Sequence, residues 1–436
     1  MSVFESLLDK IEGLTIIDAH AHLMPEAEYI FMPRDALRVY GQYVRFPMFA
    51  SGLSSEEWSR LHDPAIPILQ RWAILKPYLP LIRHTSFGRA ARAVLRHFWD
   101  AEELSEDNVV PLSQRIAEET KPGIYQRVLR DHCGIANVFN QDAPGHDGHD
   151  HPSDLDVYHG QSILLPVVAL IDIVPGSDRE VHRLGGAYGF SRLSDYLEWA
   201  RHRLVAMARA GAIAFKTFAL KETEVDAQAA EQEFADLQRR GLPLRLSAAS
   251  ALRTYIQDEL LSTVRTLGLP VAVHTGFFDV DAFHPAHLVP LLRRHPEVHF
   301  DAFHLGFPFG RDLIGVAATH ANLSLNLCWA HSMNAAMTAR GLDEAIDILG
   351  ADKIIGFGSD VRWMVEKVFG HLQIARWNIA RVLSARVENG WMDLAEAAEL
   401  ARLWLFGNPS RIYRLPKTLP VRAVAPCERS MAPVGT

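Results

Sequence analysis

The chain is poor in cysteine, in long apolar runs and in basic charge, and each shortage argues against a class of protein. Its 436 residues include three cysteines, Cys133, Cys328 and Cys427, whose spacing indicates no disulfide pairing and fits a reducing compartment. The apolar stretch at residues 163–174 is broken by a proline and an aspartate and is too short to cross a bilayer. The formal net charge is −8, and no block of like charges indicates a nucleic-acid tail.

The first residues also lack the pattern of a secretory leader. Residues 1–13 predict a short amphipathic helix that is interrupted by charged side chains and has no apolar core or cleavage site. These shortages together predict a cytoplasmic protein that binds neither membranes nor nucleic acid.

The composition that remains is that of a globular protein with a large core. Hydrophobic residues make up 48% and charged residues 22%, and the length suits one large barrel with an insertion. Eight short apolar segments alternate with helical patterns, which predicts a parallel sheet and an α/β fold of the (β/α)8 barrel type. The expected strands are residues 14–17, 135–139, 162–170, 213–218, 270–273, 298–303, 322–327 and 353–357.

The regular alternation stops after the first strand. Residues 24–108 hold three tryptophans and show helical spacing around 66–79 and 90–99, and later helices are expected over 114–131 and 342–349. The chain is therefore divided into four parts: an N-terminal helix with the first strand, a mostly helical insertion over the barrel mouth, the remainder of the barrel, and a flexible C-terminal tail. Their bounds are 1–23, 24–108, 109–415 and 416–436. The tryptophan-rich insertion is a candidate subunit contact, which leaves a homo-oligomer open.

Side chains that bind metals or transfer protons lie at the ends of five of these strands. His20 and His22 end the first strand on one face, because residues two apart in a strand point the same way. Each such residue alone has a simple structural explanation, such as a packed histidine or a capping aspartate. Since the carboxyl ends of barrel strands meet at one mouth, the occurrence of such residues at five strand ends predicts one shared site. The other members are Lys216, His274, His304 and Asp360.

A second group of histidines and aspartates occupies residues 145–152, between turn residues. A solvated surface loop is the favoured interpretation, and adventitious metal binding is the alternative.

With these motifs the chain resembles the amidohydrolase superfamily, and within it the amidohydrolase-2, or amidohydrolase-related, branch. The motifs are residues 17–22, 214–216, 273–276, 303–306 and 356–360, and the resemblance extends from about residue 15 to about residue 413. It implies a divalent ion, Zn²⁺ first and Mn²⁺ as the alternative, that lowers the pKa of a water molecule toward neutrality. The implied ligands are His20, His22, His274 and Asp360. Asp360 would also act as general base, while His304 would polarise the substrate or bind a second metal.

Lys216 decides between one ion and two. In binuclear members of the superfamily the lysine of this strand carries a carbamate that bridges both ions, whereas a bare lysine could hold a substrate carboxylate. One ion is favoured, because residues 217–220 match no secure binuclear pattern. Arg362 is a candidate clamp for an anionic substrate, with a surface salt bridge as the equal alternative. Asp18 shares the strand face of the two histidines and is expected to orient one of them.

The expected function is that of a metal-dependent hydrolase that cleaves an amide, lactone or related bond of a small, anionic substrate. The first alternative is a non-oxidative decarboxylase or an isomerase of a small carboxylic acid, because both reactions occur in the same branch. An alternative of another class is an inactive barrel that serves as a binding module. The full set of site residues argues against that alternative.

Overall fold

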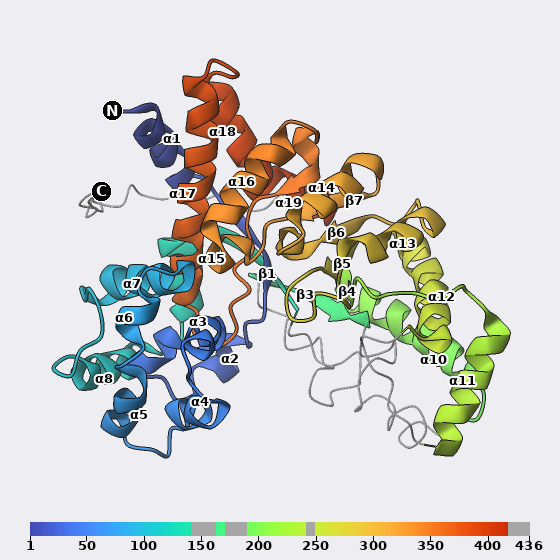
Figure 1. Cartoon of the computed structure of the whole chain (residues 1–436), viewed down its shortest axis with the longest axis horizontal. Helices are drawn as coiled ribbons and strands as arrows, with labels where there is room; N and C mark the ends of the chain where they lie inside the picture. The colour runs from blue at the N-terminus through green and yellow to red at the C-terminus, as the bar shows by residue number, and fades with distance from the viewer. Residues whose placement is uncertain (142–162, 171–189, 241–248, 417–436) are drawn as a thin grey trace.

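The expected strands form a single parallel sheet. The computed structural model describes residues 1–141, 163–170, 190–240 and 249–416. The sheet runs in chain order from β1 to β8, which confirms the (β/α)8 barrel (Figure 1). The strands are apolar because helices cover the outer face of a parallel sheet and side chains fill its interior. They are β1 (Ile16–Ala21), β2 (Ile135–Asn140), β3 (Leu164–Ala169), β4 (Ala214–Phe218), β5 (Val271–His274), β6 (Phe300–Ala302), β7 (Leu323–Asn326) and β8 (Ile354–Ile355).

The first and last strands meet through the segment that follows β8. The Ala19 amide donates to the Phe357 carbonyl at 3.1 Å, and the Asp360 amide donates to the His20 carbonyl at 2.7 Å. These bonds close the barrel where the regular strand pairing stops, and they place residues 358–360 against β1. Two functional segments from opposite ends of the chain therefore lie side by side.

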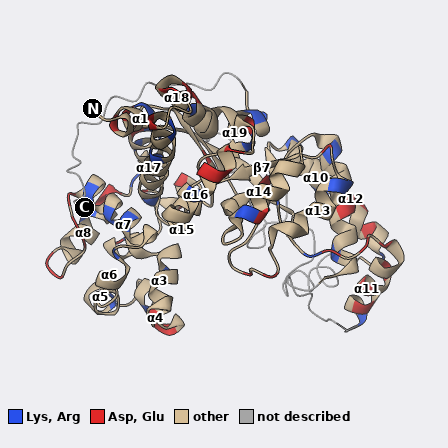
Figure 2. Ribbon diagram, turned by 45° about the horizontal axis from the view of Figure 1, so that its top comes forward, with Lys and Arg blue, Asp and Glu red and all other residues tan. Residues whose placement is uncertain are grey.

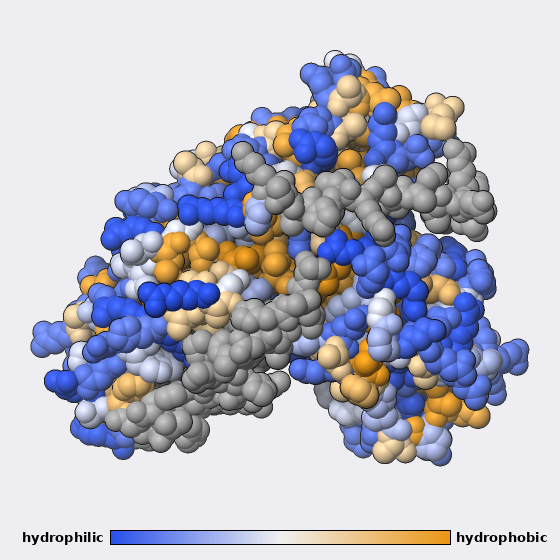
Figure 3. All heavy atoms as spheres, turned by 180° about the vertical axis from the view of Figure 1, so that it is seen from behind, coloured by the Kyte–Doolittle hydropathy of each residue, from blue (hydrophilic) through white to orange (hydrophobic). Residues whose placement is uncertain are grey.

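Helices form the outer layer of the barrel, and positions of Lys, Arg, Asp and Glu recur along α11 and α12 (Figure 2). Seen from the opposite side, apolar atoms gather in the hollow at the centre of that face, between more hydrophilic lobes (Figure 3). The N-terminal helix α1 (Val3–Glu12) packs on α17 and α18 near the top of the view in Figure 1. The other helices that follow β3 are α10 (Leu193–Arg209), α11 (Ala227–Arg240), α12 (Ala251–Leu267), α13 (Leu288–Arg294), α14 (Gly310–Thr319), α15 (Ala330–Met333), α16 (Ala335–Ile346), α17 (Lys367–Glu388), α18 (Leu394–Arg402) and α19 (Asn408–Ile412).

A helical region separates β1 from β2, as expected. It has its own apolar core, which also includes Trp329 and Met364 from the segments that follow β7 and β8. Helix α7 of this region packs on α17, and a Cβ on Gly370 would come within 2.3 Å of the Ala90 carbonyl, so the two helices approach closely. The helices of the region are α2 (Glu26–Tyr29), α3 (Arg45–Ala50), α4 (Ser55–His62), α5 (Ile68–Leu75), α6 (Leu79–Ile82), α7 (Ser86–Trp99) and α8 (Val109–Glu119).

Three expected helices differ from the observed ones. The helix expected over 66–79 is divided into α5 and α6, since Pro77 has no amide hydrogen with which to continue the helical hydrogen bonding. The helix expected over 114–131 is also divided, into α8 and a π-helical stretch at Gln126–His132, because Gly123 adopts φ +90°. The helix expected over 342–349 begins earlier, at Ala335, where the Asn334 side chain accepts a hydrogen bond from the Met337 amide.

The His/Asp group at 145–152 and the tail beyond residue 416 lie outside the described residues. Within the described parts of the chain, none of the helices combines the length and the apolar character needed to cross a membrane.

The close packing that closes the barrel predicts that a larger residue at Gly358 destabilises the fold. A Cβ there would stand 2.4 Å from the Cys328 Cβ and 2.9 Å from the His20 amide nitrogen. These atoms belong to rigid parts of the structure, so Gly358→Ala is expected to lower the free energy of unfolding by about 1–3 kcal/mol. A fall in the thermal midpoint at a fixed scan rate would confirm the prediction.

Gly315→Ala is the matched control. Gly315 lies exposed in α14, and a Cβ there meets no atom within 4 Å. Alanine favours a helix over glycine, so this midpoint should stay unchanged or rise slightly. Equal midpoints for the two variants would show that β1 and the segment after β8 are not closely packed.

Candidate metal centre

The predicted site residues gather at the carboxyl ends of the strands. His20 lies in β1, Lys216 in β4 and His274 at the end of β5, while His304 follows β6 and Asp360 follows β8. His304 and Asp360 both adopt left-handed backbone conformations, with φ of +68° and +55°. This conformation is uncommon for residues other than glycine, and here it occurs at two residues that project into one site.

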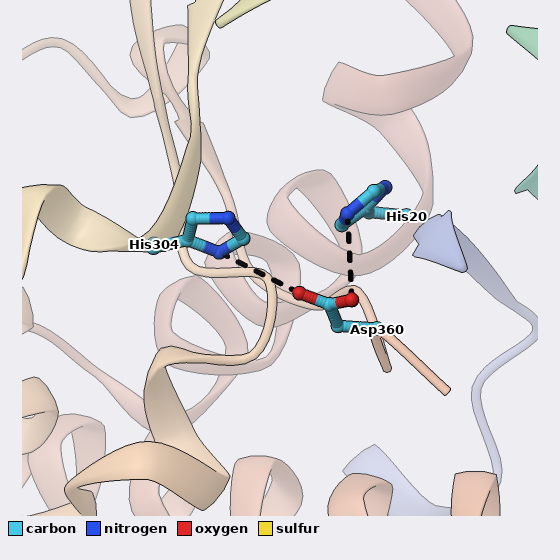
Figure 4. Close-up of side chains that lie close together, drawn as sticks. All are labelled: His20, His304 and Asp360. Atoms are coloured by element: carbon cyan, nitrogen blue, oxygen red, sulfur yellow. Dashed lines mark ion pairs between the residues drawn. The ribbon is translucent and has the colours of Figure 1, made fainter. Parts of the chain in front are cut away.

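A buried group of two histidines and one aspartate forms the centre of the site. The ligand atoms of His20, His304 and Asp360 lie within 4.8 Å of one another. The two Asp360 oxygens face different rings: Oδ1 is 3.6 Å from His20 Nε2, and Oδ2 is 4.0 Å from His304 Nδ1 (Figure 4). His22 Nε2 is 3.4 Å from Asp360 Oδ1 as well. Imidazole and carboxylate groups converging in this way are a donor set that suits a divalent ion.

His274 joins the site through His304. Its Nδ1 lies 3.0 Å from His304 Nε2, while its Nε2 donates to the Phe277 carbonyl at 2.7 Å. The sequence assigned metal ligation to His20, His22, His274 and Asp360, with His304 as a separate group. The three ligand atoms that converge most closely include His304 instead of His22 and His274, and the ligand assignment stays a prediction.

The two facing histidine nitrogens favour a cation beside them. His304 Nδ1 lies 3.1 Å from the Cys328 carbonyl, so it carries the proton and leaves Nε2 with a bare lone pair. The bond to Phe277 likewise leaves His274 Nδ1 bare, and two lone pairs then face each other at 3.0 Å. Burial is the main cause that lowers the pKa of His274 to about 3, and Lys216 adds to it, so an extra proton is disfavoured. The donor set therefore fits a metal ion.

Hydrogen bonds hold the Asp360 turn in place. The Tyr43 hydroxyl donates to Asp360 Oδ1 at 2.8 Å, and Gln42 Nε2 donates to the Asp360 carbonyl at 2.7 Å. Burial raises the pKa of the Asp360 carboxyl, while His22 and the Tyr43 hydrogen bond act in the opposite direction.

Asp18 was expected to contact a histidine ring. Its Oδ1 instead accepts hydrogen bonds from the backbone amides of His20 and Ser359, at 3.3 and 2.8 Å.

The comparison with known families agrees with this donor set. The sequence model of the amidohydrolase family Amidohydro_2 matches residues 182–415, more than half of the chain. The chain belongs to the amidohydrolase family. The chain is also 23% identical to protein fluG of Emericella nidulans over 255 residues, which are 53% of this chain and 29% of that protein. The chain thus spans less than a third of that relative's length.

Solved structures with the same fold match nearly the whole length of the chain. A glucuronate isomerase from Caulobacter crescentus is 20% identical with a TM-score of 0.77, covering 97% of this chain and 96% of that one. A uronate isomerase from Thermotoga maritima is 15% identical with a TM-score of 0.76, covering 94% and 97%. A protein from Lactobacillus casei, named provisionally as a metal-dependent hydrolase, is 14% identical with a TM-score of 0.65, covering 94% and 97%. At such identities the likeness shows the fold alone.

Two basic side chains, Lys216 and Arg362, lie beside the histidines. Lys216 is buried, and its Nζ stands 3.4 Å from the centroid of the Phe303 ring and has no hydrogen-bond partner among the described residues. Burial lowers the pKa of Lys216 to about 7. Arg362 is the second cation, and its guanidinium nitrogen lies 3.4 Å from His22 Nδ1. Both residues that the sequence offered as substrate or metal contacts are thus adjacent to the site.

Sequence reasoning expected the helical region over the barrel mouth but did not identify its residues that contact the site. Tyr43 and Gln42 stand 317 and 318 positions from Asp360, and no motif or spacing around them indicates a functional role. Trp329, whose ring centroid is 5.4 Å from that of His304, was also missed.

Proposed function

We propose that this amidohydrolase is a metal-dependent hydrolase of a small anionic substrate and cleaves an amide, lactone or related bond. The observation that supports the proposal most is the environment of Asp360. One buried carboxylate lies within 3.4 and 3.6 Å of two histidine rings and accepts a hydrogen bond from the Tyr43 hydroxyl. Such a group can hold an ion and also accept a proton, which are the two tasks of a general base in metal-assisted hydrolysis.

Each residue has a role in this proposal. His20, His304 and Asp360, with His22 and His274 beside them, would hold one divalent ion, Zn²⁺ or Mn²⁺. The bound ion would supply Lewis acidity and lower the pKa of a nearby water molecule. Asp360 takes the proton of the attacking water and returns it to the leaving group. Burial raises the pKa of Asp360, which makes its carboxylate a stronger base.

Lys216 stays an unmodified amine in this proposal, and the site uses one ion. Its Nζ faces the Phe303 ring, and the single close group of ligand atoms within the described residues supports one ion over two. The helical region would cover part of the barrel mouth, because Gln42 and Tyr43 contact Asp360 directly. Arg362 would attract the anionic group of the substrate.

A second candidate is isomerisation of a small sugar acid. The likeness in fold to the uronate isomerases of Caulobacter and Thermotoga supports this candidate, because it covers the helical region as well as the barrel. An isomerase moves a proton between neighbouring carbon atoms and needs no attacking water. Asp360 would then transfer a proton to and from carbon instead of activating water.

Metal analysis and product analysis on one preparation test the proposal. Protein purified in the presence of Zn²⁺ or Mn²⁺ is expected to retain one ion per chain and to hydrolyse members of a panel of small acidic lactones and amides. Formation of a keto acid from glucuronate without hydrolysis would favour the isomerase, and release of carbon dioxide would favour a decarboxylase. An ion content at background would favour the binding module and refute both enzymatic proposals.

A further inference from the structure

A small cavity lies at the end of the barrel opposite to the candidate metal centre. Its walls include the residues that directly precede β5 and β6, whereas the metal-site residues lie at the carboxyl ends of the strands. The turn after α12 and the end of α19 complete the cavity, and its volume is about 170 Å³. We call it the basal cavity, and its charged and titratable side chains are Arg265, Glu297, His299, Arg411 and Arg414.

Positive charge predominates around the basal cavity. Three guanidiniums line it, and Glu297 is the one carboxylate among its lining residues. Arg411 Nη2 donates to the Asp352 carbonyl at 2.6 Å and lies 3.9 Å from the Asp352 carboxylate. Within the described part of the chain, no carboxylate forms an ion pair with Arg265 or Arg414. Two guanidiniums at one cavity are thus left without a fixed anionic partner.

Arg414 has an unusual backbone and a closely packed side chain. Its φ of +54° is in the left-handed region, which is unfavourable for a residue with a Cβ. A Cβ on Gly268 would stand 2.5 Å from Arg414 Nη1, so the guanidinium lies directly over the glycine that ends α12. The partial negative charge at the carboxyl end of α12 attracts one cation there. This attraction does not account for three guanidiniums in the same cavity.

The same positive charge acts on His299. Its Nε2 lies 3.1 Å from the Ser324 hydroxyl oxygen, which holds the ring at the wall of the cavity. Burial is the main cause that lowers the pKa of His299 to about 4, and the nearby cations Arg411 and Lys353 add to it. His299 is therefore neutral at pH 7. An anion in the cavity would offset the repulsion among these cations, which the lining residues alone do not neutralise.

We propose that the basal cavity binds a phosphate group, either as inorganic phosphate or as the phosphate of a small monoester. A guanidinium is planar and always charged, and its fork of N–H donors matches phosphate oxygens. The volume is below the roughly 300–1,000 Å³ of pockets that enclose a drug-sized ligand, so it suits one small anionic group. A phosphate dianion would neutralise Arg265 and Arg414. The inference does not depend on the proposed hydrolysis, because the cavity and the metal centre lie at opposite ends of the barrel.

Phosphate binding to the full chain tests the inference. The protein is first treated with a chelator, because an ion at the metal centre could also hold phosphate. Titration calorimetry at constant ionic strength is expected to give a Kd below about 1 mM for inorganic phosphate or for glycerol 3-phosphate, and the tighter of the two identifies the source of the group. Arg265→Gln and Arg414→Gln are each expected to weaken binding roughly 5- to 50-fold, between the effect of an exposed ion pair and that of a buried charge-assisted hydrogen bond.

Two controls separate this cavity from other positive regions. Arg340→Gln removes a positive charge from the exposed surface of α16 and should leave phosphate binding unchanged. His20→Ala alters the candidate metal centre and should also leave it unchanged. Circular dichroism checks that each variant is folded. Arg265 lies exposed in the last turn of α12, where glutamine favours a helix about as well as arginine, so at least this variant is expected to fold.

Four results would overturn the inference: a Kd above about 1 mM for both phosphate compounds, unchanged binding in Arg265→Gln and Arg414→Gln, equal weakening in Arg340→Gln, or loss of binding in His20→Ala. Equal weakening in Arg340→Gln would show diffuse attraction to surface charge, and loss in His20→Ala would place the phosphate at the metal centre. Failure of the proposed function gives a different result. A protein that binds phosphate in an Arg265-dependent manner but hydrolyses nothing would keep the basal site and refute hydrolysis.

Discussion

Asp360→Asn is expected to lower turnover by about 10²- to 10⁴-fold while the fold is retained. The amide keeps the shape of the carboxylate, can still offer one oxygen to an ion and can accept the Tyr43 hydrogen bond, but it cannot take up a proton from water. Binding of a substrate analogue should be affected less than turnover, because proton transfer matters mainly in the transition state. Ion content, analogue affinity and rate measured on one preparation check this prediction.

Asp352→Asn is the control for this substitution. Asp352 lies just before β8, and its side chain is 70% exposed and outside the site, so its substitution should leave turnover and ion content unchanged. Near-normal turnover of Asp360→Asn with full ion content would refute the role of Asp360 as general base. A rate loss that follows ion loss alone would instead favour the decarboxylase or isomerase.

His20→Ala is expected to remove the ion and the activity together. His20 is 3% exposed and faces Asp360, so alanine would remove one proposed ligand of the ion at a position that bulk water does not reach. Loss of even an outer partner of a metal ligand typically costs 10–100-fold in metal affinity, and loss of a ligand should cost at least about as much. His274→Ala is expected to have the same effect, because it is proposed to lie beside the ion. The ion content of each variant after dialysis checks both predictions.

His202→Ala serves as the control, since His202 lies on the exposed surface of α10. Circular dichroism of each variant separates loss of the ion from loss of the fold. Full ion occupancy in both His20→Ala and His274→Ala would mean that the ion binds elsewhere.

Local sequence patterns were sufficient to predict the barrel. The strand expected at 135–139 is observed as Ile135–Asn140, because a buried parallel strand is a short apolar run with turn residues on both sides. The eighth strand is shorter than expected, at Ile354–Ile355, since the Gly356 amide that follows it donates to the Trp404 carbonyl instead of continuing the pairing with β7. The helix ends were less predictable, because a capping residue or a proline indicates an end only when the extent of the helix is already known.

Barrel topology also explains why residues distant in the sequence could be grouped into one predicted site. Parallel strands bring their carboxyl ends together, so His20, His274 and His304 could be grouped without coordinates. The orientation of each ring depends on partners that no local pattern encodes, such as the Cys328 carbonyl for His304. Tyr43 contacts Asp360 because the helical region folds back onto the barrel. Contacts between side chains so far apart in the sequence cannot be predicted from the spacing of residues.

The bond that joins the two ends of the barrel has a consequence for synthesis of the protein on the ribosome. Asp18 and Ser359, whose hydrogen bond fixes this contact, are 341 residues apart. At 5–20 residues per second, the first strand waits roughly 20 to 70 seconds for its last partner to be made. His20 and His22 therefore leave the ribosome long before Asp360 exists, and a chain stopped short of residue 360 cannot assemble the site. An ion held by this donor set would therefore be acquired late, after the barrel is complete.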